Sequence, residues 1–294
     1  MVKDKSLSAK TFNVINGILM AVVIIITLYP LVYVLALSLS SSEYVQAGMV
    51  SIIPRGFNIE AYKQVFADNH FWKSYGNTIV YTVLGTALNL AFTSTMAFAL
   101  SRRDLIGRKP LNMLVVFTMF FSGGLIPNFL LVKNLHIYNT IWAVLLPGAI
   151  NTYNMIIVRT FMQQLPEEIL ESGRIDGAND LQLFSKIVLP LSKPSLATIG
   201  LYYAVDHWNA YFYPMLYLKD KSKYPLQVLL KEMIVDEDLS SLSQGAAEIV
   251  GNMQPTSDML MGASIIIALI PILCVYPFVQ KYFVQGVMIG SVKG

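Results

Sequence analysis

Residues that support catalysis or metal binding are scarce in this sequence. Cys274 is the single cysteine among 294 residues, so an intrachain disulfide and a cysteine-based metal cluster are both excluded. The three histidines, His70, His136 and His207, are far apart, and the patterns HExxH, GxxxxGK[ST] and GxSxG do not occur. These absences argue against a zinc hydrolase, against a chain that hydrolyses nucleotides by itself, and against a hydrolase with a nucleophilic serine in a GxSxG motif. We therefore expect a chain that is not an enzyme and holds no cofactor or metal of its own.

Charge is scarce as well. Only 13% of the residues are charged and 55% are hydrophobic, which is roughly half the charged fraction of an ordinary soluble domain. The apolar residues gather into runs of about 20 or more, the length that a helix needs to cross a hydrocarbon core about 30 Å thick. Backbone groups in that core have no water to bond, so the runs must be helical. The sequence predicts an all-α integral membrane protein.

About six transmembrane helices are predicted from these runs. Their approximate ranges, after a short N-terminal segment 1–13, are 14–39, 75–100, 111–132, 141–161, 195–218 and 259–282. The first run is longer than the apolar part of a signal peptide, so a retained helix is favoured over a cleaved leader. Pro147 and Gly148 interrupt the fourth run, where we expect either a hinge or a pore-lining break.

The distribution of lysine and arginine predicts the orientation in the membrane. The loop between the second and third spans is strongly basic and holds Arg102, Arg103, Arg108 and Lys109. Short basic loops stay on the cytoplasmic side, and about six crossings then place both termini in the cytoplasm. One outer segment, 218–257, runs against this pattern because it carries three lysines of its own, Lys219, Lys221 and Lys223.

The segment 166–194, between the fourth and fifth spans, is predicted to form two short helices around a turn. Pro166 and the acids that follow it suit the first turn of a helix. Gly177 can adopt the left-handed conformation that ends a helix, and Asn179 or Asp180 can cap the next one. The second helix is expected to stop at Pro190. It carries an apolar stripe made of Leu181, Phe184, Ile187 and Val188.

An amphipathic segment of this kind either lies among lipid headgroups or binds a protein. Its acids, Glu167, Glu168 and Glu171, would be repelled by the anionic lipids of the inner leaflet. A protein partner is therefore the favoured alternative.

Five residues of the segment stand at a characteristic spacing: Glu171, Gly177, Ile187, Leu189 and Pro190. The spacing resembles the EAA loop of the permease subunits of binding-protein-dependent ABC importers, which reads Glu-Ala-Ala, three residues, Gly, nine residues, Ile-x-Leu-Pro. Ser172 and Gly173 replace the two alanines. The runs 174–178 and 187–194 are similar in particular to the carbohydrate-uptake branch, the relatives of the smaller maltose-importer permease. The resemblance extends over nearly the whole chain, including 57–62 and the tail 286–294.

The resemblance implies a type I ABC importer permease fold in a bacterial plasma membrane, with residues 14–294 as one permease domain and 166–194 as its cytoplasmic coupling loop. The implied partners are a second homologous permease subunit, two copies of an ATP-binding-cassette ATPase, an extracytoplasmic solute-binding protein, membrane lipid and a carbohydrate, and not nucleic acid. Mg-ATP would be bound by the ATPase subunits. The residues implied to couple to the ATPase are Glu171, Ser172, Gly173, Asp176, Gly177 and Ala178.

Polar residues inside apolar spans are costly and usually face a cavity or a neighbouring helix. The largest such cluster lies in the fifth span and contains Asp206, His207, Trp208, Asn209 and Tyr213, and a second lies in the fourth span at Asn151 and Asn154. Aromatic rings with polar planar groups suit carbohydrate, so these residues are candidates for the substrate path. An interfacial aromatic belt, a structural Asp-His pair and helix-helix hydrogen bonds are the alternatives. Asn89, Ser122 and Asn128 stand isolated, and helix packing explains them equally well.

Two other functional classes stay open at this point. A secondary transporter driven by an ion gradient needs ionisable residues within the membrane, and Asp206 is nearly alone there. A membrane-bound enzyme or assembly factor needs a clustered catalytic set, which only Asp206 and His207 approach. An ABC importer permease is therefore the favoured function.

Overall fold

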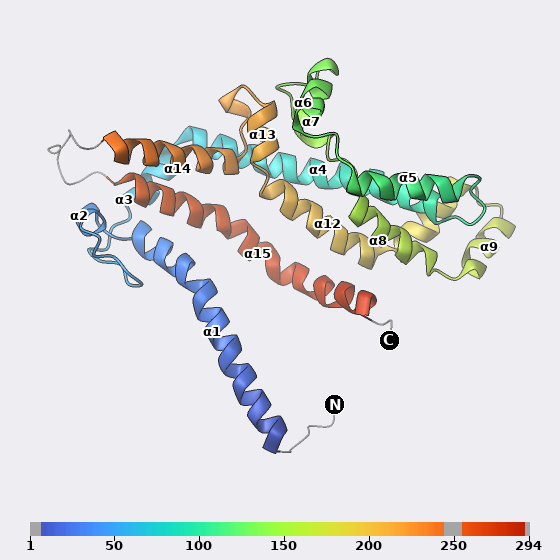
Figure 1. Ribbon diagram of the computed structural model, residues 1–294, viewed down its shortest axis with the longest axis horizontal. Coiled ribbons are helices and arrows are strands. Elements are labelled where there is room, and N and C mark those ends of the chain that lie inside the picture. The colour runs from blue at the N-terminus through green and yellow to red at the C-terminus, as the bar shows by residue number, and fades with distance from the viewer. Residues whose placement is uncertain (1–6, 244–254, 292–294) are drawn as a thin grey trace. The chain divides into compact units, whose positions relative to one another are not determined.

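The computed structural model describes residues 7–243 and 255–291, and within these ranges every regular element is a helix (Figure 1). The all-α fold class predicted from the sequence is thus confirmed. The chain divides into two compact units: Met1–Asn69 with Glu232–Ile270, and His70–Lys231 with Pro271–Gly294.

Within the part of the chain that the structure describes, three helices are long and apolar enough to cross a membrane: α1 (Leu7–Ser38), α4 (Asn69–Ser101) and α15 (Ser257–Ser291). They cover the first, second and sixth predicted spans. A fourth is formed if α5 (Arg108–Phe120) and α6 (Leu125–Asn134) count as one span, although the two are bent by 113°. The bend follows Ser122 and Gly123, and Gly124 has the positive φ of 84° that a glycine adopts without strain.

The remaining two predicted spans are interrupted. The range 141–161 contains α7 (Ile141–Leu145) and α8 (Thr152–Gln163), with the break at Pro147 and Gly148 where an interruption is expected. The range 195–218 contains α12 (Lys193–Trp208) and α13 (Phe212–Tyr217). α12 ends well before the predicted Leu218 because Pro214 lacks the N–H that a continuous helix would need, whereas the first turn of a new helix tolerates it. That these two ranges cross the membrane stays a prediction.

The first unit is built on α1 and the early part of α15. Gly262 lies so close to α1 that a Cβ built on it would be 3.2 Å from the carbonyl oxygen of Val34. The short helices α2 (Ser42–Gln46) and α3 (Glu60–Ala67) join this unit, and the hydroxyls of Ser38 and Tyr62 share a hydrogen bond of 2.8 Å. α14 (Leu226–Ser243) begins in the second unit.

The core of the second unit lies where α4, α5, α8 and α12 meet. Its buried members are Ala97, Leu100, Val115, Met155, Val158, Met162, Val188, Ile199 and Tyr203. Met155, Val158 and Met162 follow the three- to four-residue spacing of one helix face. This packing sets α8 beside α12, the two helices that carry most of the predicted substrate-path residues.

The first half of the segment 166–194 has the predicted shape. α9 (Glu167–Ile175) begins after Pro166 and ends at a turn in which Gly177 has φ +82°. The N–H of Gly177 donates to the carbonyl of Arg174, and the N–H of Ala178 donates to that of Gly173, both at 3.0 Å. These two bonds form the Schellman motif that satisfies the last carbonyls of a helix.

The next helix begins at the predicted cap. Asn179 accepts a hydrogen bond from the N–H of Gln182 through its side chain, and the Gln182 side chain accepts one from the N–H of Asn179, each at 2.9 Å. Of the two residues that the sequence offers as a cap, Asn179 is therefore the one used. This reciprocal capping box opens α10 (Asp180–Gln182).

The helix ends at Leu191, one residue past the predicted stop at Pro190, and Ser192 separates it from α12. α10 runs into a π-helical turn (Leu183–Val188), then into α11 (Leu189–Leu191), and α12 begins at Lys193. In the π turn the N–H of Leu189 donates to the carbonyl of Phe184, five residues back. The wider turn relieves the clash between the proline ring and the preceding carbonyls, so the chain stays helical through Pro190.

The predicted apolar stripe is wrong at one of its four members. Val188 is 2% exposed and Ile187 lies against Gly173, as predicted, but Leu181 is 73% exposed and the fully buried Leu183 takes its place. Phe184 does pack inward, with its ring centroid 5.2 Å from that of Phe98. The prediction assumes 3.6 residues per turn throughout. Because the π turn Leu183–Val188 has more residues than an α-helical turn, the inward position falls on Leu183 and not on Leu181.

Asn179→Ala should loosen the turn between α9 and α10. Loss of the side-chain bond that caps the N–H of Gln182 lowers the local stability by about 1 kcal/mol, whereas the backbone N–H of residue 179 can still donate to the Gln182 side chain. Hydrogen exchange of the amides of 180–184 should become faster in the purified complex. Ser185→Ala is the matched control, since its hydroxyl bonds only to the carbonyl of Leu181 in its own helical turn. Equal exchange in the two variants would show that the cap does not hold the turn.

Candidate functional site

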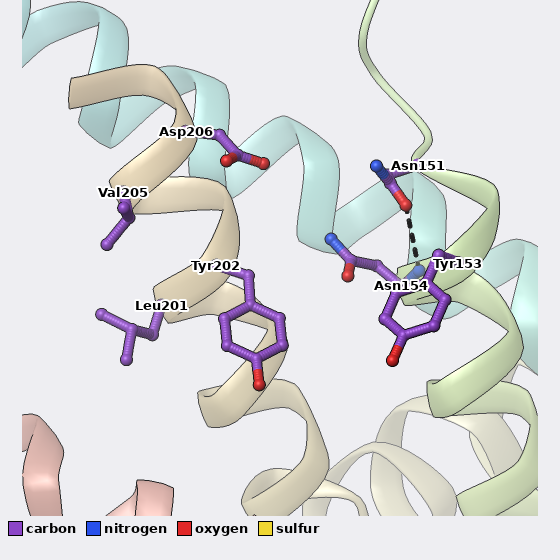
Figure 2. Close-up of a pocket in the computed structure, with 7 residues that line it drawn as sticks. All are labelled: Asn151, Tyr153, Asn154, Leu201, Tyr202, Val205 and Asp206. Carbon is purple, nitrogen blue, oxygen red and sulfur yellow. Dashed lines mark hydrogen bonds between the residues drawn. The ribbon is translucent and has the colours of Figure 1, made fainter. Parts of the chain in front are cut away.

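Two cavities lie in the second unit beside the break between α7 and α8. The first, of about 440 Å³, is lined from α8 and α12 (Figure 2). Figure 2 shows Asn151, Asn154 and Tyr153 on one side and Asp206 and Tyr202 on the other. The second cavity, of about 640 Å³, shares Asn151 and Asp206 with the first and is also lined by α13. The predicted polar patches of the fourth and fifth spans thus meet around one space.

Most of the predicted substrate-path residues face this space. Asn151, Asn154 and Asp206 line the first cavity, and His207 and Tyr213 line the second together with Asn151 and Asp206. Two predicted residues line neither cavity. Trp208 is buried, with its ring 6.0 Å from that of Tyr75 in an edge-to-face contact, and Asn209 is exposed and donates to the carbonyl of Val205.

Asn89 of α4 organises the break between α7 and α8. It is only 1% exposed, and its amide nitrogen donates to the carbonyls of Gly148 and Ala149 at 2.7 and 3.1 Å. Its amide oxygen lies 2.7 Å from Nε2 of His207. Since an amide oxygen can only accept, Nε2 of His207 carries the proton. Asn89, which looks isolated in the sequence, therefore links α4 to α12 and to the break between α7 and α8.

Tyr203 makes a second link to the same break. Its hydroxyl shares a hydrogen bond of 2.7 Å with that of Thr93 and accepts one of 3.1 Å from the N–H of Asn151. Asn151 in turn caps α8, because its side-chain oxygen accepts from the N–H of Asn154 at 3.1 Å. Sequence reasoning misses Tyr203, although a tyrosine four residues before His207 lies on the same face of the helix.

One face of α4 supports both links. Gly85, Asn89 and Thr93 are spaced by four residues, so they lie in a row. A Cβ on Gly85 would lie 2.4 Å from Nε2 of His207, so only glycine leaves room for this ring. The row contacts α12 through His207 and Tyr203, and Asn89 also bonds the segment before α8 at Gly148 and Ala149.

The cavity lining suits the binding of a polar, ring-shaped molecule. Tyr213 and Tyr217 stack with ring centroids 5.8 Å apart at the second cavity, and amide groups and Asp206 provide hydrogen-bonding groups. Among the described residues that line the two cavities, none is a lysine or an arginine. Among the described residues, no group of three or more His, Cys, Asp and Glu side chains is placed to hold a metal ion.

The predicted coupling residues form the surface of α9 and its turn. Glu171, Ser172, Asp176 and Gly177 are exposed, and Ala178 is half-buried. Gly173 is buried: a Cβ on it would lie 2.8 Å from both Ile187 and Leu183. A small residue at this position lets α9 pack against the π turn, and the rest of the set remains free to meet a partner.

Ion pairs tie α9 to the basic loop that joins α4 to α5. Nη2 of Arg174 lies 2.7 Å from Oδ2 of Asp104, and Arg103 pairs with Glu167 at 3.0 Å. Hydrogen bonding from Arg174, followed by Arg102, lowers the pKa of Asp104 to about 2. A depressed carboxyl pKa means that this contact is complete above about pH 4 and is lost as the pH falls through about 2.

Comparison with known proteins places most of the chain in one family. Residues 91–289 match the family described as binding-protein-dependent transport system inner membrane component. The chain is 46% identical to the polygalacturonan/rhamnogalacturonan transport system permease protein YtcP of Bacillus subtilis (strain 168), over 92% of this chain and 94% of that protein. It is 43% identical to protein LplC of the same organism, over 98% of this chain and 96% of that protein.

A solved structure has the same fold. It is a chain in the crystal structure of a bacterial ABC transporter involved in the import of the acidic polysaccharide alginate. The two chains are 37% identical and superpose with a TM-score of 0.86, over 96% of this chain and 100% of the other. The type I importer permease fold that the sequence predicts is therefore confirmed.

Asn89→Leu should destabilise the protein although the two side chains are similar in size. The change leaves the carbonyls of Gly148 and Ala149 and the N–H of His207 without their partner, at a cost of about 1–3 kcal/mol for each buried group left unsatisfied. Thermal unfolding of the purified protein in detergent measures the effect. Asn209→Leu is the control, because Asn209 is exposed and bonds only within its own helix. An equal melting temperature for both variants would contradict the assigned role of Asn89.

Charge reversal tests the link between α9 and the basic loop. Arg174→Asp and Asp104→Arg should each speed hydrogen exchange of the α9 amides at neutral pH, because like charges then face each other. The double variant restores an attractive pair and should slow exchange again. If the double variant exchanges as fast as the single ones, the ion pair does not hold α9.

Proposed function

Because the chain belongs to the family of binding-protein-dependent transport system inner membrane components, we propose that it is the permease subunit of an ABC importer for an acidic oligosaccharide. The observation that carries the proposal is the segment 166–194. Its α9 and Gly177 turn present the predicted coupling residues at the surface, at one end of α12, whose other end carries Asp206.

The relatives support the carbohydrate class. The permease YtcP is named for polygalacturonan and rhamnogalacturonan, and the solved structure is of an importer for alginate. Galacturonan and alginate are polymers of uronic acids, which are sugars that carry a carboxylate on each ring. A short uronic-acid oligosaccharide is the substrate class that we assign to this chain.

Asn151, Asn154, Asp206, His207 and Tyr213 form the substrate path in this proposal. Their support is that they line two adjoining cavities together with the stacked tyrosines. Sugar rings stack on aromatic faces, and their hydroxyls exchange hydrogen bonds with amides and carboxylates. Trp208 and Asn209 are left out of the path, since Trp208 packs against Tyr75 and Asn209 faces away from both cavities.

Energy for transport comes from other subunits in this proposal. Two ATPase subunits bind Mg-ATP and contact α9 on the cytoplasmic side, a second permease completes the path, and an extracytoplasmic binding protein delivers the sugar. The surface of α9 supports such a contact: Ile175 is 86% exposed, next to exposed acids. The loop 102–107 lies at the same side, with Ile106 95% exposed, and both termini are assigned to the cytoplasm.

Purification from the native membrane tests the assembly. The tagged chain should co-isolate with an ATP-binding-cassette ATPase and a second permease, because the isolated chain contains no nucleotide-binding pattern. Isolation of the chain alone, with proton-dependent uptake in vesicles, would instead identify a secondary transporter.

Glu171→Ala and Gly177→Val test the coupling role within that assembly. Both should reduce uptake and substrate-stimulated ATPase activity severalfold while the affinity for the binding protein stays unchanged. Gly177→Val acts through strain, because φ +82° costs a β-branched residue about 1–2 kcal/mol. Glu43→Ala, an exposed acid of α2, is the control. Normal transport in both α9 variants would rule out the docking role.

A further inference from the structure

Three cations gather where α5 and α8 pack together, beside the basic loop. Arg108 and Lys109 are the first two residues of α5, and Arg159 lies in α8. The two helices share one core, in which Val115 and Val158 are both buried. Arg108 and Arg159 are partly buried, and Lys109 is exposed. These three residues are called the cation cluster below.

Asn112 holds two members of the cation cluster close together. Its amide nitrogen donates to the carbonyl of Arg108 at 2.8 Å, and its amide oxygen accepts from Nη1 of Arg159. The charge of Arg108 acts on Arg159, and Nε of Arg159 is buried without a hydrogen-bond partner. Like charges that are held together away from bulk water repel each other strongly. An anion beside them would relieve this repulsion.

The chain itself offers no such anion. No aspartate or glutamate occurs from Leu105 to Pro166, so α5 to α8 contain no carboxylate side chain. The acids on either side of this stretch, Asp104 and Glu167, are already paired with other arginines at 2.7 and 3.0 Å. Among residues 7–243 and 255–291, no carboxylate forms an ion pair with any member of the cation cluster. The neutralising group is therefore to be sought in another molecule.

An exposed apolar row continues along α5 from the cation cluster. Lys109, Met113 and Phe117 are spaced by four residues, so they lie above one another on the helix. Met113 is 76% exposed, and Leu114 and Phe117 beside it are exposed as well. The ring of Phe117 stacks on that of Phe121, with centroids 4.2 Å apart. Cations at one end of an exposed apolar row match the two parts of a phospholipid, a phosphate and its acyl chains, whereas a soluble anion would use only the cations.

We propose that the cation cluster binds the headgroup phosphate of an anionic phospholipid in the inner leaflet, with the acyl chains along the exposed row of α5. The proposal rests on the proposed function for the leaflet alone, because the coupling role of α9 sets the basic loop in the cytoplasm. Arg108 uses only Nε within the chain, donating to the carbonyl of Leu100 at 3.2 Å, so its terminal nitrogens can face the phosphate. Lys109 lies next to it on the surface, and Arg159 adds charge one helical turn deeper.

The bound lipid would join α5 to α8 at the end of α8 that leads to α9. Its negative charge offsets the repulsion between Arg108 and Arg159, which the protein alone leaves in place. A zwitterionic headgroup brings its own cation with the phosphate, so it offsets this repulsion less well. The cation cluster should therefore distinguish lipids by their net charge.

Lipid binding to the purified importer tests the proposal. Native mass spectrometry measures the affinity for phosphatidylglycerol and for phosphatidylcholine of the same chain length, and the wild type should bind phosphatidylglycerol more tightly. Each basic residue that is removed should weaken this binding roughly fivefold, so Arg108→Gln/Lys109→Gln should weaken it roughly ten- to thirtyfold and Arg159→Gln about fivefold. The affinity for phosphatidylcholine should change little.

Two single variants keep the test decisive. Lys109→Gln changes an exposed side chain and should weaken phosphatidylglycerol binding about fivefold even where the double variant does not fold. Lys133→Gln is the matched control, because this exposed lysine of α6 also has no ion pair among the described residues but lies outside the cation cluster. Its affinity for phosphatidylglycerol should equal that of the wild type.

The remaining outcomes separate the lipid site from its rivals. Equal affinity of the wild type for the two lipids refutes the proposal. Inorganic phosphate that displaces phosphatidylglycerol assigns the cation cluster to a free anion and overturns the lipid site. A preference that the permease chain shows by itself and the complete importer lacks would mean that another subunit covers α5, which also overturns it. A chain that prefers phosphatidylglycerol but isolates without an ATPase would support the lipid site and refute the proposed function.

Discussion

A broken helix leaves buried backbone carbonyls and amides without partners, and the second unit is organised around satisfying them. The break between α7 and α8 exposes the carbonyls of Gly148 and Ala149 and the N–H of Asn151. Asn89 donates to both carbonyls, and the Tyr203 hydroxyl accepts from the amide. Each such group would cost about 1–3 kcal/mol if it were left buried and unpaired. The break can therefore persist only where α4 and α12 are held against it.

The same bonds shape the space that a substrate would use. Asn89 also fixes His207, and Gly85 leaves room for its ring, so α12 lies against α4 in a single register. That register turns Asp206 toward Asn151 across the first cavity (Figure 2). An unbroken α8 would extend into the volume beside Asn151, so the cavity exists because the helix stops there. The hydrogen bonds of Asn89 and Tyr203 thus both stabilise the break and shape the cavity beside it.

The parts of this arrangement that follow from local sequence are predictable, and those that depend on distant partners are not. Gly177 and Asn179 act on neighbours within a few residues, so their roles as helix stop and cap can be read from the chain. Asn89 and His207 are 118 positions apart, and nothing in an apolar run says which helix an asparagine will meet. The π turn before Pro190 also escapes prediction, because periodicity assumes one residue spacing throughout. Trp208 looks like its polar neighbours in sequence, yet the direction of one helix face sends it to Tyr75.

The consecutive helices after Asn179, which are interrupted by a turn at Ser192, give the coupling segment a mechanical route to the cavity. α10, the π turn, α11 and α12 follow one another from Asp180 to Trp208, roughly 40 Å of helix. Gly173 packs on Leu183 and Ile187, so α9 rests on the first part of this path. A displacement of α9 is expected to be transmitted along these consecutive helices and to shift Asp206 and His207 at the far end. Asn89 and Tyr203 connect this end of α12 to the break between α7 and α8. A displacement of α12 must therefore strain or exchange the hydrogen bonds of these two residues.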